Sequence, residues 1–264
     1  KMGVHLMIEK PLSTSSEGIA DLLDICNKNN TSLMTGYNLR FVPSLKKFKS
    51  LLEEKIIGDI WSVRSEVGQF LPFWRPDSDY RDTVTAKKAL GGGALLELSH
   101  EIDYLNWIFG KVKWVQGSLT KQSNLEVDVE DLVHLILGFY KNKDRNPLIV
   151  SLSMDCIRQD GTRTCTAIGE LGSLRWDGQA GSVELWSKGS QEWEELYQQE
   201  SSFDESYYAE WKNFISSIEQ NHDPLVSGKD GLEIMEIIEA SRQAAEKGSR
   251  VLVEYRYDLT KNSI

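Results

Sequence analysis

The chain has 264 residues, of which 40% are hydrophobic and 27% are charged, so it can bury a sizeable core in one large domain or two ordinary ones. Its 30 basic and 40 acidic residues give a formal net charge of −10, which argues against nucleic acid or an anionic membrane as a partner. Because there is no apolar run of about 18 residues and no signal-peptide pattern at the start, we expect a soluble protein.

The cysteines and histidines do not form a recognisable metal or disulfide pattern. The cysteines are Cys26, Cys156 and Cys165. Their odd number and the lack of a CxxC spacing argue against a disulfide framework and against zinc, and favour a reducing, cytoplasmic compartment. Three of the histidines, which lack metal-ligand spacing, are interpreted as structural: His5, His134 and His222. The sequence therefore predicts no metal site.

The first segment of the chain reads as a strand, a helix and a second strand. The apolar run 3–8 predicts a buried strand, and Pro11 prevents its continuation. The hydroxyl cluster 13–16 is expected to cap a helix that runs to about Asn29, and residues 31–37 predict the second strand. Such a unit normally belongs to a parallel sheet. Since two strands alone would leave both edges exposed, the pattern predicts partner strands before residue 1.

A long loop and a glycine run separate the next predicted elements. A helix over about 44–54 and a strand over 60–70 precede the polar, aromatic-studded loop 71–89. A loop of this length without a pattern of its own is more often functional than ornamental. After Gly91-Gly92-Gly93, an uninterrupted helical pattern runs to Phe109, with Gly110 as its stop.

Two faces of this predicted helix carry different residue types. The apolar, core-facing stripe consists of Leu95, Leu98, Ile102, Leu105 and Phe109. Roughly opposite, Glu97, His100 and Tyr104 fall within a narrow arc. A carboxylate, an imidazole and a phenol can move protons, so we predict that this arc faces a cleft.

The remainder of the chain predicts strands and two helices. The predicted strands are 112–119, 130–140, 148–157, 162–169, 172–176, 183–186 and 251–255, and the helices are 204–220 and 229–247. Apolar and polar residues alternate along 148–157, which fits an antiparallel sheet with one covered face. Residues 132–140 are apolar on both faces, which predicts self-association through the sheet, and the tryptophan-rich run 176–193 is interpreted as sheet packing or a subunit contact.

Three segments together resemble the Gfo/Idh/MocA family. They are Glu9-Lys10-Pro11 after the first strand, Gly36-Tyr37-Asn38-Leu39-Arg40-Phe41 after the second, and Gly91-Gly92-Gly93 followed by His100 and Asp103. Each segment is weak alone, but their order and separation make the match specific, and it covers nearly the whole chain. Members of this family are NAD(P)-dependent oxidoreductases of sugars, sugar nucleotides and cyclitols. Within the loop 71–89, the sequence Phe73-Trp74-Arg75-Pro76, continuing to Asp79-Tyr80-Arg81, resembles the branch of the family associated with bacterial surface-carbohydrate synthesis.

The resemblance implies an α+β fold in two parts. Residues 1–38 would be the C-terminal part of a dinucleotide-binding Rossmann domain, and residues 39–264 a substrate-binding and oligomerisation domain with a mostly antiparallel open sheet packed against helices. No GxGxxG follows a strand, so the chain resembles a member that lacks the first part of its Rossmann domain. We therefore expect weak or no binding of the NAD or NADP cofactor. The sequence also carries Glu97 three residues before His100, where many members have Asp four before the histidine.

The same resemblance assigns roles to individual residues. Oxidation of an alcohol needs a hydride acceptor, a base and a group that fixes the oxygen. His100 is predicted to be the base and Lys10 the group that orients the hydroxyl. Glu97 either orients His100 or binds a substrate hydroxyl, and its structural alternative is an ordinary first-turn glutamate. The predicted cofactor-binding residues are Glu9, Lys10, Pro11, Asn38 and Arg40. The predicted substrate-binding residues are Tyr37, Trp74, Arg75, Tyr80, Arg81, Asp103 and Tyr104.

Structural roles are the alternatives for these residues. His100 could be a satisfied interfacial histidine, Lys10 a solvated lysine at a strand end, and Asp103 a cap for a neighbouring loop. The sequence thus predicts an oxidoreductase acting on a sugar or sugar nucleotide, assembled as a homodimer or homotetramer through its sheet. The alternative is a catalytically inactive relative that serves as a sugar-binding or assembly module.

Overall fold

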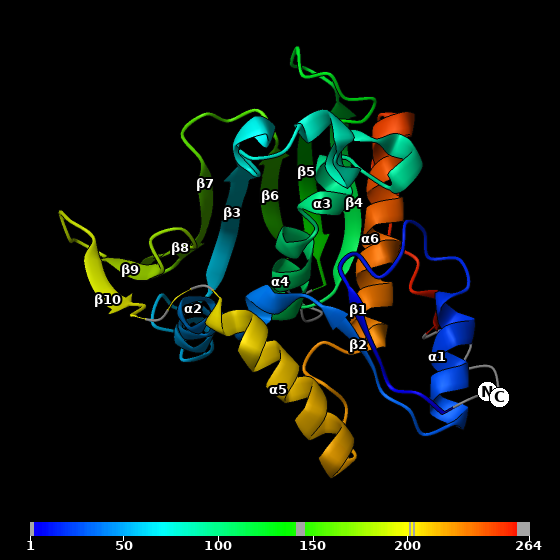
Figure 1. The fold of residues 1–264 in the computed structure, drawn as a ribbon. Helices are drawn as coiled ribbons and strands as arrows, with labels where there is room; N and C mark the ends of the chain where they lie inside the picture. The colour runs from blue at the N-terminus through cyan, green and yellow to red at the C-terminus, as the bar shows by residue number, and fades with distance from the viewer. Residues whose placement is uncertain (1–2, 141–145, 201, 203, 258–264) are drawn as a thin grey trace.

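A nine-stranded sheet forms the centre of the molecule in the computed structural model, which describes residues 3–140, 146–200, 202 and 204–257 (Figure 1). Its strands are β3 (Ile60–Gly68), β4 (Val112–Thr120), β5 (Leu132–Phe139), β6 (Leu148–Asp155), β7 (Thr162–Gly169), β8 (Gly172–Asp177), β9 (Ser182–Ser187), β10 (Glu194–Gln198) and β11 (Val251–Leu252). They lie in the order β10-β9-β8-β7-β3-β6-β5-β4-β11. Only β3 and β6 run parallel, which confirms the prediction of a mostly antiparallel sheet. The sequence did not predict β10.

A separate two-stranded sheet carries the N-terminal segment. Its strands β1 (Leu6–Glu9) and β2 (Leu33–Gly36) pair in parallel and are joined by α1 (Ile19–Lys28), as predicted. The predicted helix cap was wrong. The helix begins after Gly18, whose φ of 75° lies in the left-handed region, and no side chain caps it. Among the hydroxyl residues, Ser16 instead donates its backbone N–H to Glu239, 2.7 Å away.

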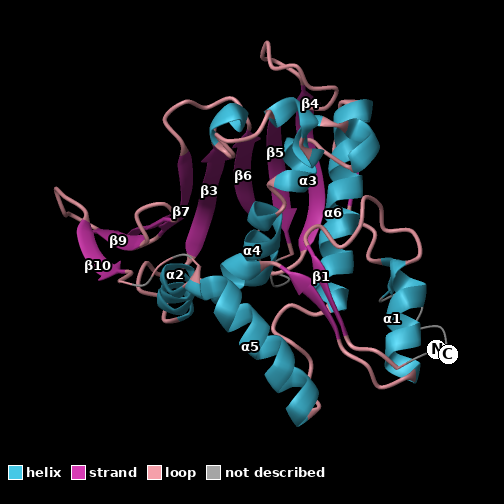
Figure 2. Cartoon of the chain, in the orientation of Figure 1, coloured by secondary structure: helices cyan, strands magenta, loops and turns pink. Residues whose placement is uncertain are grey.

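Helices α3 (Ala94–Glu97), α4 (His100–Phe109) and α6 (Gly228–Lys247) cover one face of the large sheet and lie in front of its strands in Figure 2. Helix α2 (Pro43–Glu53) packs on β8, β9 and β10, and α5 (Glu205–Gln220) extends away below the sheet. A capping box between Ser227 and Asp230 begins α6, the longest of these helices. The other face stays open in the single chain, because Val133 and Leu135 of β5 are buried whereas His134 and Ile136 between and after them are exposed.

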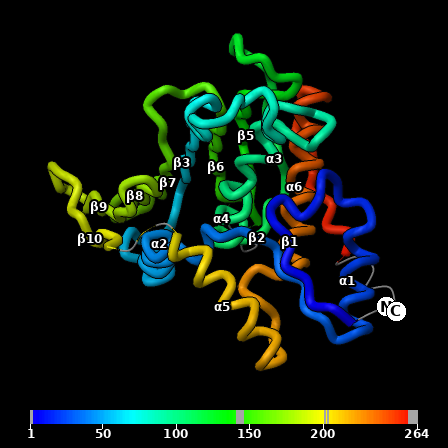
Figure 3. The backbone as a smooth tube through the Cα atoms, in the orientation of Figure 1, coloured from blue at the N-terminus to red at the C-terminus, as the bar shows by residue number. Residues whose placement is uncertain are grey.

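The segments at the two ends of the chain lie side by side, as the tube in Figure 3 shows. The backbone N–H of Thr35 in β2 donates to the carbonyl of Val226, 3.0 Å away, just before α6. The side chain of Asn27 in α1 donates to the hydroxyl of Tyr257 at 2.8 Å. In the described residues, no helix is both long and apolar enough to cross a membrane.

The predicted helix over residues 94–109 is interrupted. Two helices, α3 and α4, meet at Leu98 and Ser99, so the prediction of an unbroken helix was wrong. In a continuous helix the N–H of Glu101 would donate to the carbonyl of Glu97. Here it donates to Leu98 at 3.2 Å, and the Glu97 carbonyl is released from the helix. Gly110 ends α4, as predicted, and the predicted apolar stripe lies in the core.

The loop between β3 and α3 contains short turns of 3-10 helix and no strand. They are η2 (Leu71–Phe73), η3 (Tyr80–Asp82), η4 (Val84–Ala86) and η5 (Lys88–Leu90). A further turn, η1 (Asn38–Phe41), connects β2 to α2. The loop ends where Gly92 fits between backbone segments. A Cβ atom at Gly92 would lie 2.3 Å from the carbonyl oxygen of Val84, so only glycine fits there without movement.

Candidate active site

A pocket of about 560 Å³ lies where several parts of the fold meet. They include the end of β1, the α3–α4 junction, the end of β3, the start of β7 and the start of α5. It is lined by Lys10, Val67, Gln69, Trp74, Glu97, Leu98, His100, Thr162, Arg163, Gly178, Gln179 and Tyr207. Four residues that the sequence selected thus line one pocket, although Lys10 and the Glu97–His100 segment are far apart in the chain. The roles predicted for them remain predictions.

Lys10 is held at the pocket by the interruption between α3 and α4. Its ammonium group donates to the released carbonyl of Glu97 at 2.8 Å, and it lies 3.9 Å from the carboxylate of the same residue. A cation at a helix C-terminus also interacts favourably with the helix dipole. The helix break and the end of β1 therefore fix the lysine beside the carboxylate.

His100 begins α4 and is half-buried at the pocket. Its Nδ1 atom is enclosed and has no hydrogen-bond partner among the described residues. The edge of the Tyr37 ring packs against the imidazole, with centroids 5.6 Å apart. Burial lowers the pKa of His100 well below its usual value, and the positive charges of Lys10 and Arg163 lower it further. The imidazole is therefore neutral at pH 7 and can accept a proton.

Arg163 and Glu101 form an ion pair behind the pocket wall that the sequence did not predict. The Nε of Arg163 donates to Glu101 at 2.8 Å, and the carboxylate side chain is fully buried. Burial raises the pKa of Glu101, and Arg163 opposes that shift. A signal was present in the sequence, because Arg163 is the one charged residue of the strand Thr162–Gly169.

Arg40 and Asp103 contact each other instead of lining the pocket. They form a buried, bidentate ion pair with a shortest distance of 2.6 Å. Arg40 also donates to Asp230 and to the carbonyl of Leu225. All these bonds lie within the fold and neither residue lines the pocket, so cofactor binding by Arg40 and substrate binding by Asp103 stay predictions beside the structural alternative.

Tyr104, Tyr37 and Asn38 also lie outside the pocket lining. Tyr104 is fully buried, and its hydroxyl lies 2.6 Å from that of Ser65 in β3. Tyr104 lies one turn beyond His100 on the same side of α4 and is buried against the sheet, so the prediction that it faces a cleft with Glu97 and His100 was wrong. Tyr37 and Asn38 are buried; Tyr37 supports the ring of His100, and Asn38 donates to Ser206 at 2.9 Å.

The residues predicted from the long loop separate into two groups. Trp74 lines the pocket, where its Nε1 donates to the carbonyl of Gln69 at 2.9 Å. Arg75 is exposed and does not line the pocket. Tyr80 and Arg81 instead contact Glu126 in the β4–β5 loop. The backbone N–H of Glu126 donates to the Tyr80 hydroxyl at 3.1 Å, and Arg81 donates to the Glu126 carboxylate at 3.0 Å. The structure therefore brings only Trp74 to the pocket.

Two further predicted residues flank Lys10. Glu9, at the end of β1, is exposed, and Pro11 follows Lys10 through a cis peptide bond. Neither lines the pocket. Close to Glu9 lies Glu210 of α5, which the sequence did not single out. Glu210 is 1% exposed, and its Oε1 has no hydrogen-bond partner among the described residues. Burial, assisted by the charges of Glu9 and Asp103, raises its pKa to about 8.

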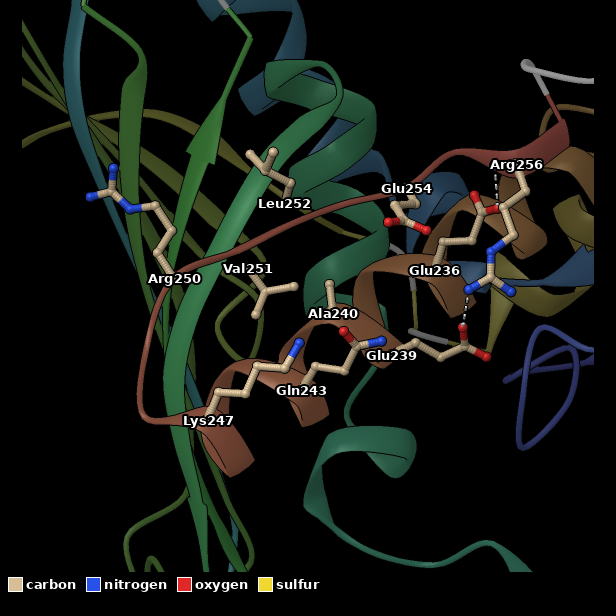
Figure 4. Close-up of a pocket in the computed structure, with 10 residues that line it drawn as sticks. All are labelled: Glu236, Glu239, Ala240, Gln243, Lys247, Arg250, Val251, Leu252, Glu254 and Arg256. Atoms are coloured by element: carbon tan, nitrogen blue, oxygen red, sulfur yellow. Dashed lines mark hydrogen bonds and ion pairs between the residues drawn. The ribbon is translucent and has the colours of Figure 1, made fainter.

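A second, smaller hollow of about 300 Å³ lies between α6 and residues 250–256 (Figure 4). Figure 4 shows Arg256 between two glutamates of α6: its N–H donates to Glu236 at 2.8 Å, and its guanidinium lies 3.9 Å from Glu239. The whole lining carries three carboxylates and three cations, and no histidine lines the hollow. In the part of the chain that the structure describes, no group of three or more His, Cys, Asp or Glu side chains could hold a metal ion.

Known proteins resemble this chain in sequence. The myo-inositol 2-dehydrogenase of Thermotoga maritima is 24% identical over 262 residues, which cover 95% of this chain and 73% of that protein. The trans-1,2-dihydrobenzene-1,2-diol dehydrogenase of Xenopus laevis is 27% identical over 178 residues, which cover 66% of this chain and 50% of that protein. The chain thus spans half the length of the Xenopus relative.

A solved structure and a family model agree with these relatives. A levoglucosan dehydrogenase in complex with NADH superposes with a TM-score of 0.83 at 23% identity, over 96% of this chain and 74% of that one. Residues 49–253 match the model of the oxidoreductase family, C-terminal alpha/beta domain (Gfo/Idh/MocA). Because this match covers most of the chain, the protein belongs to the Gfo/Idh/MocA oxidoreductase family.

Proposed function

We propose that this protein is an NAD(P)-dependent oxidoreductase that moves a hydride between a nicotinamide cofactor and an alcohol or ketone of a sugar or sugar nucleotide. The observation that carries the proposal is the pairing of Lys10 with a neutral His100 at one pocket, beside the end of a parallel strand. Ligands of parallel α/β sheets bind beyond the carboxyl ends of their strands. The names of the relatives, which are dehydrogenases of a cyclitol and a diol, support the same reaction class.

The residues around β1 fit the nicotinamide end of such a cofactor. Lys10 and His100 leave a pocket between them, and the enclosed Nδ1 of His100 has no partner in the described residues. A nicotinamide bound here would accept or give the hydride. The N-terminal sheet has two parallel strands in the described residues and the sequence contains no GxGxxG, so these residues do not supply the diphosphate cradle.

His100 is suited to take the proton of the substrate hydroxyl. Its lowered pKa keeps the imidazole unprotonated at pH 7, so the ring can accept a proton as the alcohol is oxidised and return it when a ketone is reduced. The packing of Tyr37 against the ring limits its rotation. Lys10 is held by the carbonyl of Glu97, and its remaining N–H groups can donate to the substrate oxygen, which stabilises negative charge as the proton leaves.

The test is a spectrophotometric assay of the open reading frame that encodes this chain, with any in-frame sequence that precedes Lys1. Absorbance at the wavelength of reduced nicotinamide would be followed with NAD or NADP and a panel of sugars and cyclitols. We expect His100→Asn and Lys10→Met each to lower kcat by roughly 10²–10⁴. His222→Asn is the matched control, since His222 is an exposed histidine outside the pocket, with Nδ1 2.8 Å from the carbonyl oxygen of Asp223.

Two outcomes would contradict this function. Full activity of both pocket variants would show that the proton moves elsewhere. Saturable sugar binding without turnover of either cofactor would favour a sugar-binding or assembly module instead. Calorimetry of the 264-residue chain with NAD and NADP should give weak or no binding, and tight binding would contradict the expectation that the phosphate cradle lies outside these residues.

We also infer that two copies associate through the open face of the sheet. Ile136 of β5 and Ile149 of β6 are 43% and 36% exposed. Ile136 pairs with Ser151, two residues along the strand from Ile149, so the two isoleucines are diagonal neighbours on that face. Sedimentation velocity should give a dimer or tetramer for the wild type and a shift toward monomer for Ile136→Lys, whereas Tyr208→Lys on exposed α5 should change nothing. A monomeric wild type would contradict this association.

A further inference from the structure

Arg163 lies at the pocket although nothing in the proposed proton transfer uses it. It lies near the start of β7, between β3 and β8 in the large sheet, and its side chain is 21% exposed. It lines the same pocket as Lys10 and His100, and its charge is close enough to His100 to lower the pKa of that imidazole. A substrate in this pocket would therefore lie within reach of the guanidinium.

The ion pair with Glu101 leaves one end of the guanidinium available. Glu101 accepts a hydrogen bond from Nε at 2.8 Å. Within residues 3–140, 146–200, 202 and 204–257, no hydrogen bond involves either terminal nitrogen of Arg163. A guanidinium has five N–H donors in a fixed plane, so the buried carboxylate orients the group while the Nη1–Nη2 end keeps four donors.

The neighbouring turn is shaped to admit the arginine. A Cβ atom at Gly178 would lie 2.9 Å from Cγ of Arg163 and 2.8 Å from the ring of Trp176. The backbone N–H of Gly178 donates to the carbonyl of Arg163 at 2.7 Å. Glycine therefore lets the turn pack directly on the arginine stem, and this contact fixes the side chain against the pocket wall.

The charges of the pocket favour an anion at this position. Lys10 and Arg163 contribute two positive charges to the lining, against one carboxylate, Glu97, which lies 3.9 Å from Lys10. The carboxylate of Glu101 is buried behind the wall and does not line the pocket. The parallel N–H groups of a guanidinium end match the two oxygens of a carboxylate, and such charge-assisted bonds are stronger than bonds to neutral hydroxyls.

We propose that Arg163 binds a carboxylate of the substrate, so that the pocket selects sugar acids, such as a hexuronate, over neutral sugars. The inference rests on the proposed function in one respect, because it takes this pocket as the sugar site. It adds that the far end of the sugar, away from the reacting carbon at Lys10 and His100, carries the negative charge.

The test compares D-glucuronate with its neutral methyl ester by saturation-transfer NMR titration of the purified chain. We expect the wild type to bind glucuronate tighter than the ester by roughly tenfold to a hundredfold, as charge-assisted bonds imply. Because Arg163→Met alone would leave Glu101 buried without a partner, the main variant is Glu101→Gln/Arg163→Met, with its folding checked by circular dichroism. This variant should lose the preference for glucuronate and retain the affinity for the ester.

Arg158→Gln is the matched control, since Arg158 is a nearby exposed arginine that pairs with Asp160 and Glu66 and does not line the pocket. It should keep the preference. Equal affinities of the wild type for the acid and the ester, a preference that survives in the double variant, or absence of binding by either sugar would each overturn the assignment. Equal affinities would leave the proposed oxidoreductase intact, because that function is tested separately by the His100 and Lys10 variants.

Discussion

The carboxylate of Asp103 lies 2.6 Å from the guanidinium of Arg40, and both side chains are almost completely removed from solvent. The two residues are 63 positions apart, so their contact joins η1 to α4. The Cζ atom of the same guanidinium lies over the ring of Trp107, 5.7 Å from the ring centroid. This pair holds the start of α4, and with it His100, in its position beside the pocket.

Removing one partner of this pair should destabilise the fold strongly. Arg40→Met leaves Asp103 charged and buried, and we expect it to lower the free energy of unfolding by about 3–5 kcal/mol in urea titrations. Arg81→Met is the matched control, because Arg81 forms a similar pair with Asp79 at 2.6 Å, but at the exposed surface. It should cost far less, because solvent screens an exposed pair. Similar losses for both variants would contradict the structural role of the Arg40–Asp103 pair.

The buried carboxyl of Glu210 should make stability depend on pH. Its pKa is raised to about 8 in the folded protein, above the ordinary glutamate value of 4.5, so the folded state binds the proton more tightly. That contribution to stability is complete below pH 4.5 and is lost as pH rises through about 8. Glu210→Gln, which cannot ionise, should raise the unfolding free energy at pH 9 by about 2 kcal/mol relative to wild type and change little at pH 5. Thermal melts at both pH values measure this; an equal effect at each would argue against titration of Glu210.

The imidazole of His100 should stay neutral in mildly acidic solution. Its pKa is lowered chiefly by burial and then by the charge of Lys10, so protonation should occur well below pH 6.5. The Cε1–H resonance that disappears in His100→Asn identifies this residue in an NMR titration. Lys10→Met should raise the midpoint, since it removes the nearer positive charge. A wild-type midpoint at or above 6.5 would contradict the burial of the ring and the proton acceptance proposed for it.

Gly92 should tolerate no side chain. A Cβ there would lie 2.3 Å and 2.5 Å from the carbonyl oxygens of Val84 and Thr85, and backbone atoms cannot rotate away. We expect Gly92→Ala to cost about 3 kcal/mol or more, as overpacking of a rigid site does. Gly189→Ala is the control: its φ of 87° also disfavours alanine, but nothing lies within 4 Å of the added atom, so the cost should be about 1 kcal/mol. Chemical denaturation of both variants checks the difference.

Local patterns predicted most of the fold. The parallel unit β1–α1–β2, the alternation in β6 and the apolar stripe that includes Leu95 and Ile102 all follow from periodicities of 2 and 3.6 residues, which depend only on neighbouring positions. The strand β10 was missed because the tryptophan-rich stretch before it was interpreted as packing. Its alternation is short, and its register with β9 is irregular.

The site was only partly predictable, because local patterns do not show which distant residues contact each other. Lys10 and His100 were selected from motifs, and the structure brings both to the pocket. Its place as the one charged residue of β7 marked Arg163, but Glu101 lies 62 positions away, so no local pattern could indicate that the two residues pair. The interruption of the helix at Leu98 and Ser99 was also not predictable, because neither residue breaks helices. Tyr104 was predicted at the cleft because helical spacing indicates which side of the helix a residue takes but not how far the cleft extends along it, and the structure buries its hydroxyl against Ser65.

The interruption between α3 and α4 also separates the registers of the two helices. In a continuous helix, one inserted or deleted residue would turn every following side chain by about 100° and carry His100 away from the pocket. Here, α4 takes its orientation from the Arg40–Asp103 pair, and α3 takes its own from Lys10. The spacing between the carboxylate and the histidine can therefore change in length during evolution without loss of the position of either group.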